Sequence, residues 1–251
     1  MNVDGGVLQA FETTVVDEEK KTFVNTEVNE NINGIVVFKR STKYIKYLNL
    51  FFKRIMDIIG SLVGITILIP LTVIVKIVNI LNKDYGPIFY SHERIGKNGE
   101  HFKMYKFRSM CMNSQEVLEK ILFEDEDARK EWEETMKLKN DPRITPIGKI
   151  LRKTSLDEFP QFINVLKGEM SLVGPRAVID GEIEKFDIYK NAVLSVKPGI
   201  TGYWASHGRS DTSYDERVKM EFYYVKNNTV FMDIRILFKT VLSVIKKEGA
   251  I

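Results

Sequence analysis

Two adjacent acids, Asp157 and Glu158, are the side chains in this sequence whose types and spacing best suit covalent chemistry. They lie between two large apolar residues, and Arg152 and Lys153 come shortly before them. An ionised carboxylate can attack phosphorus to give an acyl phosphate. Nearby cations would hold a phosphate and keep the Asp157 carboxylate ionised. Glu158 could bind a metal ion or serve as a base, so the cluster indicates phosphate chemistry.

A purely structural role explains the same acids. The run from Ser155 to Glu158 matches the S-x-x-E capping box, in which the acid completes a helix start. The helix macrodipole also favours acids at that end. Pro160 conflicts with a start at Ser155, because it would fall at the fifth helical position, whereas a start nearer Asp157 brings it into the first turn. Spacing alone favours capping and leaves both interpretations open.

Further cations could complete a phosphate site. Arg176 ends the turn Gly174-Pro175-Arg176, where an exposed arginine could hold phosphate through two hydrogen bonds. Lys106 and Arg108 belong, with Lys103, to a cationic line on one predicted strand. The alternatives are an ordinary surface arginine and a solvated strand face. The single cysteine, Cys111, excludes an intrachain disulfide, and no Cys/His cluster has zinc-site spacing.

An uncharged apolar run from Ile58 to Val75 predicts a membrane segment. Its eighteen residues would rise about 27 Å as a helix, just short of a hydrocarbon core of about 30 Å. Pro70 lies inside the run and should bend or break the helix. Basic residues flank both ends, which favours a segment that enters and leaves on one side. A single-pass helix with a tolerated proline is the alternative.

The net charge of +3 conceals an asymmetry along the chain. Residues 1–36 are acidic, and the next stretch is basic up to Arg54. Basic residues beside an apolar run suit an anionic membrane surface, where each contributes roughly 1 kcal/mol. The motifs of nucleic-acid-binding proteins are missing, so we expect no nucleic-acid partner.

The rest of the chain predicts a membrane-attached α/β domain. Residues 1–45 form a polar extension, 46–83 the membrane segment and 84–251 the catalytic domain. Gly96-Lys97-Asn98-Gly99 predicts a hairpin between strands that start near Ile88 and Phe102. Residues 115–139 predict one helix. A basic amphipathic helix from Asp233 onward would either lie at a membrane interface or pack on the core.

Many ordered motifs resemble the bacterial sugar transferase family, the monotopic phosphoglycosyl transferases that initiate capsule, exopolysaccharide and O-antigen assembly. The resemblance covers about residues 50–251 and rests on these segments: Lys53-Arg54 with Asp57, Gly86-Pro87-Ile88-Phe89, Arg94-Ile95-Gly96, Lys106-Phe107-Arg108-Ser109-Met110, Asp141-Pro142-Arg143-Ile144-Thr145, Leu151-Arg152-Lys153-Thr154-Ser155-Leu156-Asp157-Glu158-Phe159-Pro160-Gln161, Ser171-Leu172-Val173-Gly174-Pro175-Arg176 and Lys197-Pro198-Gly199-Ile200-Thr201-Gly202.

The resemblance implies a re-entrant helix-break-helix anchor, broken at Pro70 and cytoplasmic at both ends. It also implies a mainly helical cytoplasmic catalytic domain with a small β-hairpin and amphipathic interfacial helices. The protein would lie on the cytoplasmic face of the bacterial inner membrane, and a homo-oligomer is compatible with this arrangement.

The resemblance further implies a ping-pong mechanism with Mg²⁺. Asp157 would attack the sugar-linked phosphate of a UDP-sugar, UMP would leave, and the phosphosugar would pass to undecaprenyl phosphate. Glu158 would help with the metal or the acceptor, so Asp157 and Glu158 are the expected metal ligands. Arg152 and Arg176 fall on family arginines that hold phosphate, and we take Lys106 and Arg108 as further substrate-binding residues.

Three segments depart from the family pattern. Pro175-Arg176-Ala177 replaces Pro-Arg-Pro, Ile69-Pro70 replaces Ser-Pro, and Trp204-Ala205-Ser206-His207 replaces Trp-Gln-Val. The residues that follow are more similar to members that use hexoses such as galactose or glucose. The alternative function is a non-catalytic membrane adaptor of a polysaccharide assembly complex, against which the intact acids and arginines argue.

Overall fold

The computed structural model describes residues 31–32, 35–36, 43–135, 138–208 and 212–246, and the chain divides into two compact units, 1–44 and 45–251. In the first unit, the short strands β1 (Asn31–Ile32) and β2 (Ile35–Val36) pair antiparallel. Most of the predicted polar extension lies outside the described residues.

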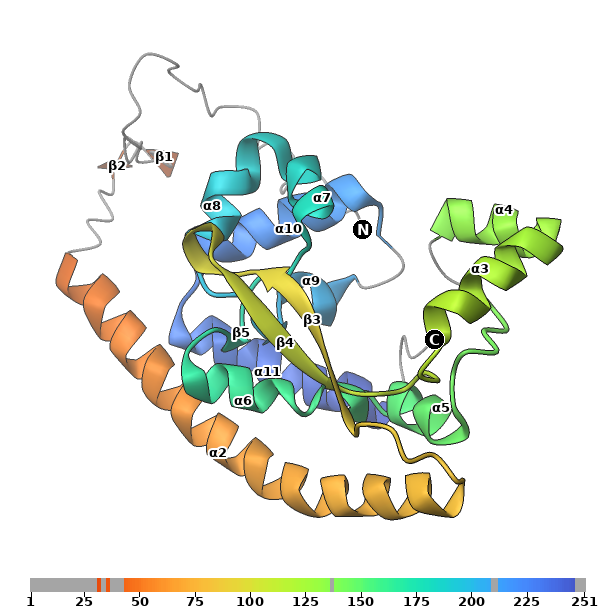
Figure 1. Ribbon diagram of the computed structural model, residues 1–251. Helices are drawn as coiled ribbons and strands as arrows, with labels where there is room; N and C mark the ends of the chain where they lie inside the picture. Colours follow the sequence, from red (N-terminus) through yellow and green to blue (C-terminus); the bar gives the residue numbers. More distant parts are fainter. Residues whose placement is uncertain (1–30, 33–34, 37–42, 136–137, 209–211, 247–251) are drawn as a thin grey trace. The chain divides into compact units, whose positions relative to one another are not determined.

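A single long helix, α2 (Lys43–Leu81), contains the predicted membrane segment. Within the described residues it is the one helix long and apolar enough to cross a membrane. The predicted break at Pro70 is wrong, because the helix continues through the proline and bends along its length (Figure 1). The side chains of Thr66 and Thr72 donate to carbonyls one turn earlier, at Leu62 and Leu68. Such bonds bend helices without ending them.

All other elements of the second unit lie on one side of α2 (Figure 1). Asp57, Ser61, Leu68, Val75 and Asn79 of α2 are buried, at spacings that place them on one helical face. Most of the remaining surface of α2 is exposed and aliphatic or aromatic, as expected for contact with lipid.

The predicted hairpin is confirmed. Strands β3 (Phe89–Ile95) and β4 (His101–Phe107) pair antiparallel, joined through a 3₁₀ turn, η2 (Lys97–Gly99). Asn98 and Gly99 both have positive φ, a conformation that asparagine and glycine tolerate best.

The predicted helix over 115–139 is instead two helices, α3 (Ser114–Glu124) and α4 (Glu126–Thr135). Asp125 has extended backbone angles, and its carboxylate accepts a hydrogen bond from the amide of Ala128. The acid therefore caps the start of the second helix, which helical periodicity alone could not show.

The rest of the second unit is built around a short parallel pair of strands, β5 (Ser171–Val173) and β6 (Gly199–Thr201). The elements before β5 are α5 (Pro146–Lys153), η3 (Leu156–Glu158) and α6 (Gln161–Lys167). Those between the strands are α7 (Asp180–Ile183), η4 (Glu184–Tyr189) and α8 (Lys190–Leu194). Those after β6 are α9 (Tyr203–His207), α10 (Tyr214–Asn227) and α11 (Val230–Lys246).

Two of the basic residues before the apolar run, Lys53 and Arg54, bind protein rather than facing a membrane surface. Lys53 Nζ donates to Asp233 Oδ2 (2.6 Å), the carbonyl of Val173 (2.8 Å) and the hydroxyl of Tyr224 (3.1 Å). Arg54 donates to the carbonyls of Val165 and Leu166 at the end of α6. The prediction of a lipid-facing basic block is therefore wrong for these two residues, because both are committed to fixing α2 onto the domain.

The C-terminal helix α11 confirms the predicted amphipathic helix and shows which face packs. Asp233 and Ile236 are buried. The apolar row of Ile234, Phe238 and Val241 is more than half exposed. This pattern favours the interfacial interpretation over packing on the core.

We expect Lys53→Met to lower the free energy of unfolding in detergent by about 3–5 kcal/mol, because Asp233 would stay buried without its cation. Chemical denaturation followed by circular dichroism measures this loss. Lys46→Met, at an exposed position on the same helix, is the matched control. A loss no larger than that of the control would show that the ion pair does not hold α2 in place.

Candidate active site

The turn that carries Asp157 and Glu158 is a single 3₁₀ turn and not a capped α-helix. Ser155 has a left-handed conformation (φ 56°), and its side chain makes no capping hydrogen bond. The α-helix that follows begins at Gln161, immediately after Pro160. The capping-box interpretation is therefore wrong, and helix capping does not explain the two acids.

Apolar packing fixes this turn above α2. Leu156 and Phe159, which flank the acids, pack against a buried cluster of Leu68, Val75, Phe107 and Leu151. One turn further on, the ring of Phe162 lies where a side chain at Gly64 of α2 would be, within 2.5 Å of a Cβ built there. The acids are thus held on the side of the domain that faces the membrane helix.

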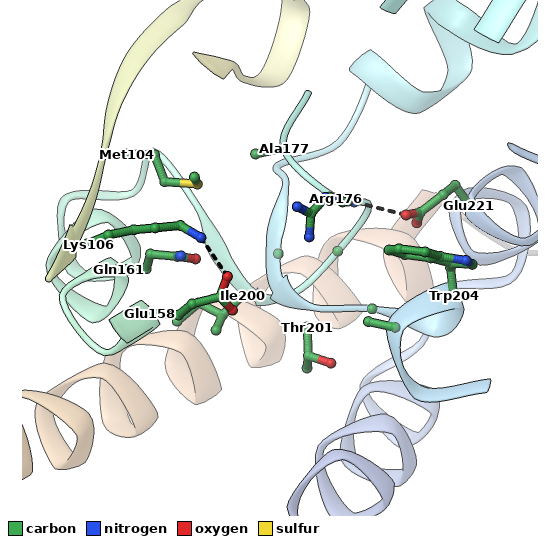
Figure 2. A pocket seen from close by; sticks show the side chains of 14 residues that line it. Met104, Lys106, Glu158, Gln161, Arg176, Ala177, Ile200, Thr201, Trp204 and Glu221 are labelled. Carbon is green, nitrogen blue, oxygen red and sulfur yellow. Dashed lines mark hydrogen bonds and ion pairs between the residues drawn. The ribbon is translucent and has the colours of Figure 1, made fainter. Parts of the chain in front are cut away.

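A pocket opens beside the acids and is lined from several elements (Figure 2). Lys106 of β4 and Glu158 lie on one side of it, and Arg176, Trp204 and Glu221 lie on the other (Figure 2). The remaining lining residues are Met104, Gln161, Gly174, Ala177, Gly199, Ile200, Thr201, Gly202 and Ala205.

Asp157 is half-buried, and neighbouring charges of both signs act on the pKa of its carboxyl. Burial raises the pKa of the Asp157 carboxyl above its usual value, and the adjacent Glu158 raises this pKa further. The positive charges of Lys106 and Arg152 act against both effects and lower the pKa. The predicted cations are therefore present, although burial outweighs them.

Lys106 and Arg152 are themselves held by specific contacts. Lys106 Nζ donates to Glu158 Oε1 at 2.8 Å. Arg152 Nε donates to Ser109 Oγ at 2.9 Å. Helix α5, which carries Arg152, packs so closely against the backbone of Ser109 that a Cβ on Gly148 would lie 2.0 Å from the Ser109 carbonyl oxygen. Only glycine permits this approach, which brings Arg152 to Asp157.

Arg176 follows β5 in a loop that hydrogen bonds fasten to β6. The amide of Gly174 donates to the carbonyl of Thr201, and the amide of Gly199 donates to the carbonyl of Pro175. The amide of Arg176 donates to Glu221 Oε1 at 3.0 Å. The Arg176 side chain is exposed, so its guanidinium is available to the pocket.

Arg108 does not join the other predicted residues. It is buried, and its guanidinium donates to Asp84 and to the carbonyls of Pro87 and Met110. This pairing lowers the pKa of Asp84. The contacts give Arg108 a structural role at the end of α2, so we leave it out of the proposed substrate site.

Among the pocket residues outside the predicted site set, Trp204 and Glu221 have side chains that could act on the site. Trp204 has the Arg217 guanidinium 4.7 Å from its ring centroid. Glu221 lies on the buried face of α10 with Val218 and Tyr224. The signal for Glu221 was a charged residue at a helical position where the apolar period expects a core side chain.

The acids fit Mg²⁺ only together with a substrate. Among the described residues, no group of three His, Cys, Asp or Glu side chains could hold a metal ion. Magnesium is commonly bound by one or two carboxylates and completed by substrate phosphates and water. Asp157 and Glu158 supply such a pair.

Comparison with known proteins identifies the family of this chain. Residues 48–247 match the family described as bacterial sugar transferase. The chain is 49% identical over 216 residues to a UDP-galactose-lipid carrier transferase of Erwinia amylovora, covering 86% of this chain and 45% of that protein. It is 50% identical over 200 residues to an undecaprenyl-phosphate galactose phosphotransferase of Salmonella typhimurium, covering 80% and 42%.

A shorter relative matches almost end to end. The exopolysaccharide production protein ExoY of Rhizobium meliloti is 43% identical over 198 residues, covering 79% of this chain and 87% of that protein. The chain spans less than half the length of the Erwinia and Salmonella relatives. The matched region includes α2 from Leu48 onward, the acids and every residue of the pocket, and the chain belongs to the bacterial sugar transferase family.

Proposed function

We propose that this protein transfers a hexose-1-phosphate from a UDP-hexose to undecaprenyl phosphate, with release of UMP, and so initiates capsule or exopolysaccharide assembly. The observation that carries the proposal is the position of Asp157, which lies under the influence of Lys106 and Arg152 beside a pocket that also presents Arg176. The names of the relatives support the substrates, and two of those names specify galactose.

The reaction proceeds in two displacements at one phosphorus. The Asp157 carboxylate attacks the sugar-linked phosphorus, the bond from that phosphorus to the oxygen shared with the second phosphate breaks, and UMP leaves. A phosphate oxygen of undecaprenyl phosphate then attacks the same phosphorus and releases the Asp157 carboxylate. The product is undecaprenyl diphosphate sugar. Phosphoryl transfer requires mainly positioning and charge stabilisation, which Lys106, Arg152 and Arg176 provide.

Mg²⁺ would be held by Asp157 and Glu158, and it would neutralise phosphate charge when bound. Lys106 keeps the Glu158 carboxylate at the pocket through their 2.8 Å contact. The chain's own cations therefore orient the acids for a metal as well as for a phosphate.

The ends of α2 support a re-entrant anchor on the cytoplasmic face. Near its start, Lys53 bonds to Asp233 of the catalytic domain. Just after its end, Asp84 bonds to Arg108 of the same domain at 2.7 Å. A helix that crossed the bilayer would place its ends on opposite sides, and one soluble domain could not hold both. The bend and the exposed apolar surface suit a helix that enters one leaflet and returns, with α11 lying at the interface. The expected homo-oligomer stays a prediction.

We expect Asp157→Asn to lower UMP release from a UDP-hexose by at least about a thousandfold, because the nucleophile is lost. Detergent-solubilised protein, undecaprenyl phosphate, Mg²⁺ and a panel of UDP-sugars provide the assay. Radiolabelled sugar phosphate should remain on wild-type protein and be absent from the variant. A labelled variant would remove Asp157 from the nucleophile role, and a wild-type protein inactive on every UDP-sugar would favour the adaptor.

The pH dependence of kcat/KM tests the charge balance at Asp157. Activity requires the ionised carboxylate, so the rate should rise with pH through the pKa of Asp157. Lys106→Met removes a charge that lowers this pKa, so the acidic limb should move to higher pH. Lys103→Met, at an exposed position on the same strand, should leave the limb unchanged. An unmoved limb in Lys106→Met would show that Lys106 does not act on the nucleophile.

The topology can be tested with single cysteines at positions 45 and 83 in a Cys111→Ser background. Both cysteines should react with a membrane-impermeant maleimide only when the cytoplasmic face is accessible, as in inverted vesicles. Labelling of the two positions from opposite faces would rule out the re-entrant anchor.

A further inference from the structure

Glu221 is a buried acid that the proposed reaction does not use. Its exposed fraction is 1%, and it lies on α10 at the wall of the pocket. Its Oε1 accepts the hydrogen bond from the Arg176 amide, and Figure 2 shows its carboxylate directed at the Arg176 loop. Its Oε2 has no hydrogen-bond partner among the described residues. Burying a carboxylate is costly, so a position of this kind calls for a purpose.

The Arg176 loop needs a restraint at this point. The neighbouring bonds from Gly174 and Gly199 fasten the loop to β6. Glu221 of α10 satisfies the amide of Arg176 itself, and Ala177 follows where the resembling family has a second proline. A hydrogen bond to an ionised carboxylate is about twice as strong as a neutral one.

The charges around Glu221 come from three elements. Arg176 of the loop and Arg217 of α10 attract its negative charge, and Glu182 of α7 repels it. Arg217 is already paired with Glu182 at 2.8 Å, so it cannot neutralise Glu221 fully. Burial is the largest effect, and it raises the pKa of Glu221 to about 7. Tyr224, on the same helix, also interacts electrostatically with Glu221.

We propose that Glu221 is the positioning residue of the phosphate site: its buried carboxylate holds the backbone of Arg176 and thereby keeps the Arg176 guanidinium at the pocket. This inference rests on the proposed function of Arg176 as a phosphate-binding residue. Glu221 contacts no reacting atom and acts through Arg176.

A double-mutant cycle tests the proposal. Glu221→Ala should lower kcat/KM for the UDP-hexose by about 10- to 100-fold, as expected when a binding group is displaced. In an Arg176→Ala background the same substitution should cost about twofold or less, because residues that act as one unit are not additive. Glu221→Gln keeps an acceptor for the Arg176 amide and should restore most of the rate. It should also remove any change in KM that titrates near pH 7.

The controls separate the possible failures. Asp215→Ala, at an exposed position on the same helix, should match wild type, and thermal melts identify any variant that is unfolded. Equal losses from Glu221→Ala in both backgrounds would overturn the positioning role while the proposed function stands. Failure of the wild-type protein to release UMP would instead contradict the proposed function itself.

Discussion

The rest of the structure depends on the hydrogen bonds that the ammonium group of Lys53 makes to the domain. Its three N–H groups bind Asp233 of α11, Tyr224 of α10 and the carbonyl of Val173 at the end of β5. One side chain of the membrane helix therefore fixes two helices and strand β5. The residue after the strand, Gly174, begins the Arg176 loop, so the position of the proposed phosphate site is set from the membrane helix. Asp57 adds to this, because its carboxylate accepts hydrogen bonds from Ser171 and from the amide of Leu172.

The far end of α2 is fixed to the same domain by a second ion pair, and a helix held at both ends has to bend. Asp84 lies 31 residues beyond Lys53, and its ion pair with Arg108 ties it to the end of the hairpin. A straight helix of that length would rise about 46 Å. Pro70 removes one backbone hydrogen bond between the two fixed ends, so bending there costs little. The helix can follow the domain at both ends while the rest of its surface stays apolar and exposed.

Local sequence patterns predict three elements of the fold correctly: the hairpin, the apolar helix and the C-terminal helix. The hairpin follows from Asn98-Gly99, and the membrane segment and α11 follow from runs of apolar residues. The patterns failed where a distant partner decides the outcome. Arg108 was assigned to substrate because its strand is basic, but Asp84 and two carbonyls occupy it. The acids at 157 and 158 fit a capping motif, but Ser155 adopts a left-handed conformation. Their assignment as catalytic residues came from resemblance and stays a prediction.

The same packing that holds Asp157, the proposed nucleophile, also opposes its ionisation. Leu156 and Phe159 anchor the turn on the apolar cluster above α2, and this burial raises the pKa of Asp157. A looser turn would leave the acid better solvated, but it would no longer fix the acid relative to the membrane helix. Lys106 and Arg152 reduce the conflict, since they restore part of the stabilisation that water would provide. They also supply charge that a phosphate needs. If the site serves a soluble nucleotide and a lipid phosphate in turn, as proposed, it requires these cations because Asp157 must stay close to the membrane.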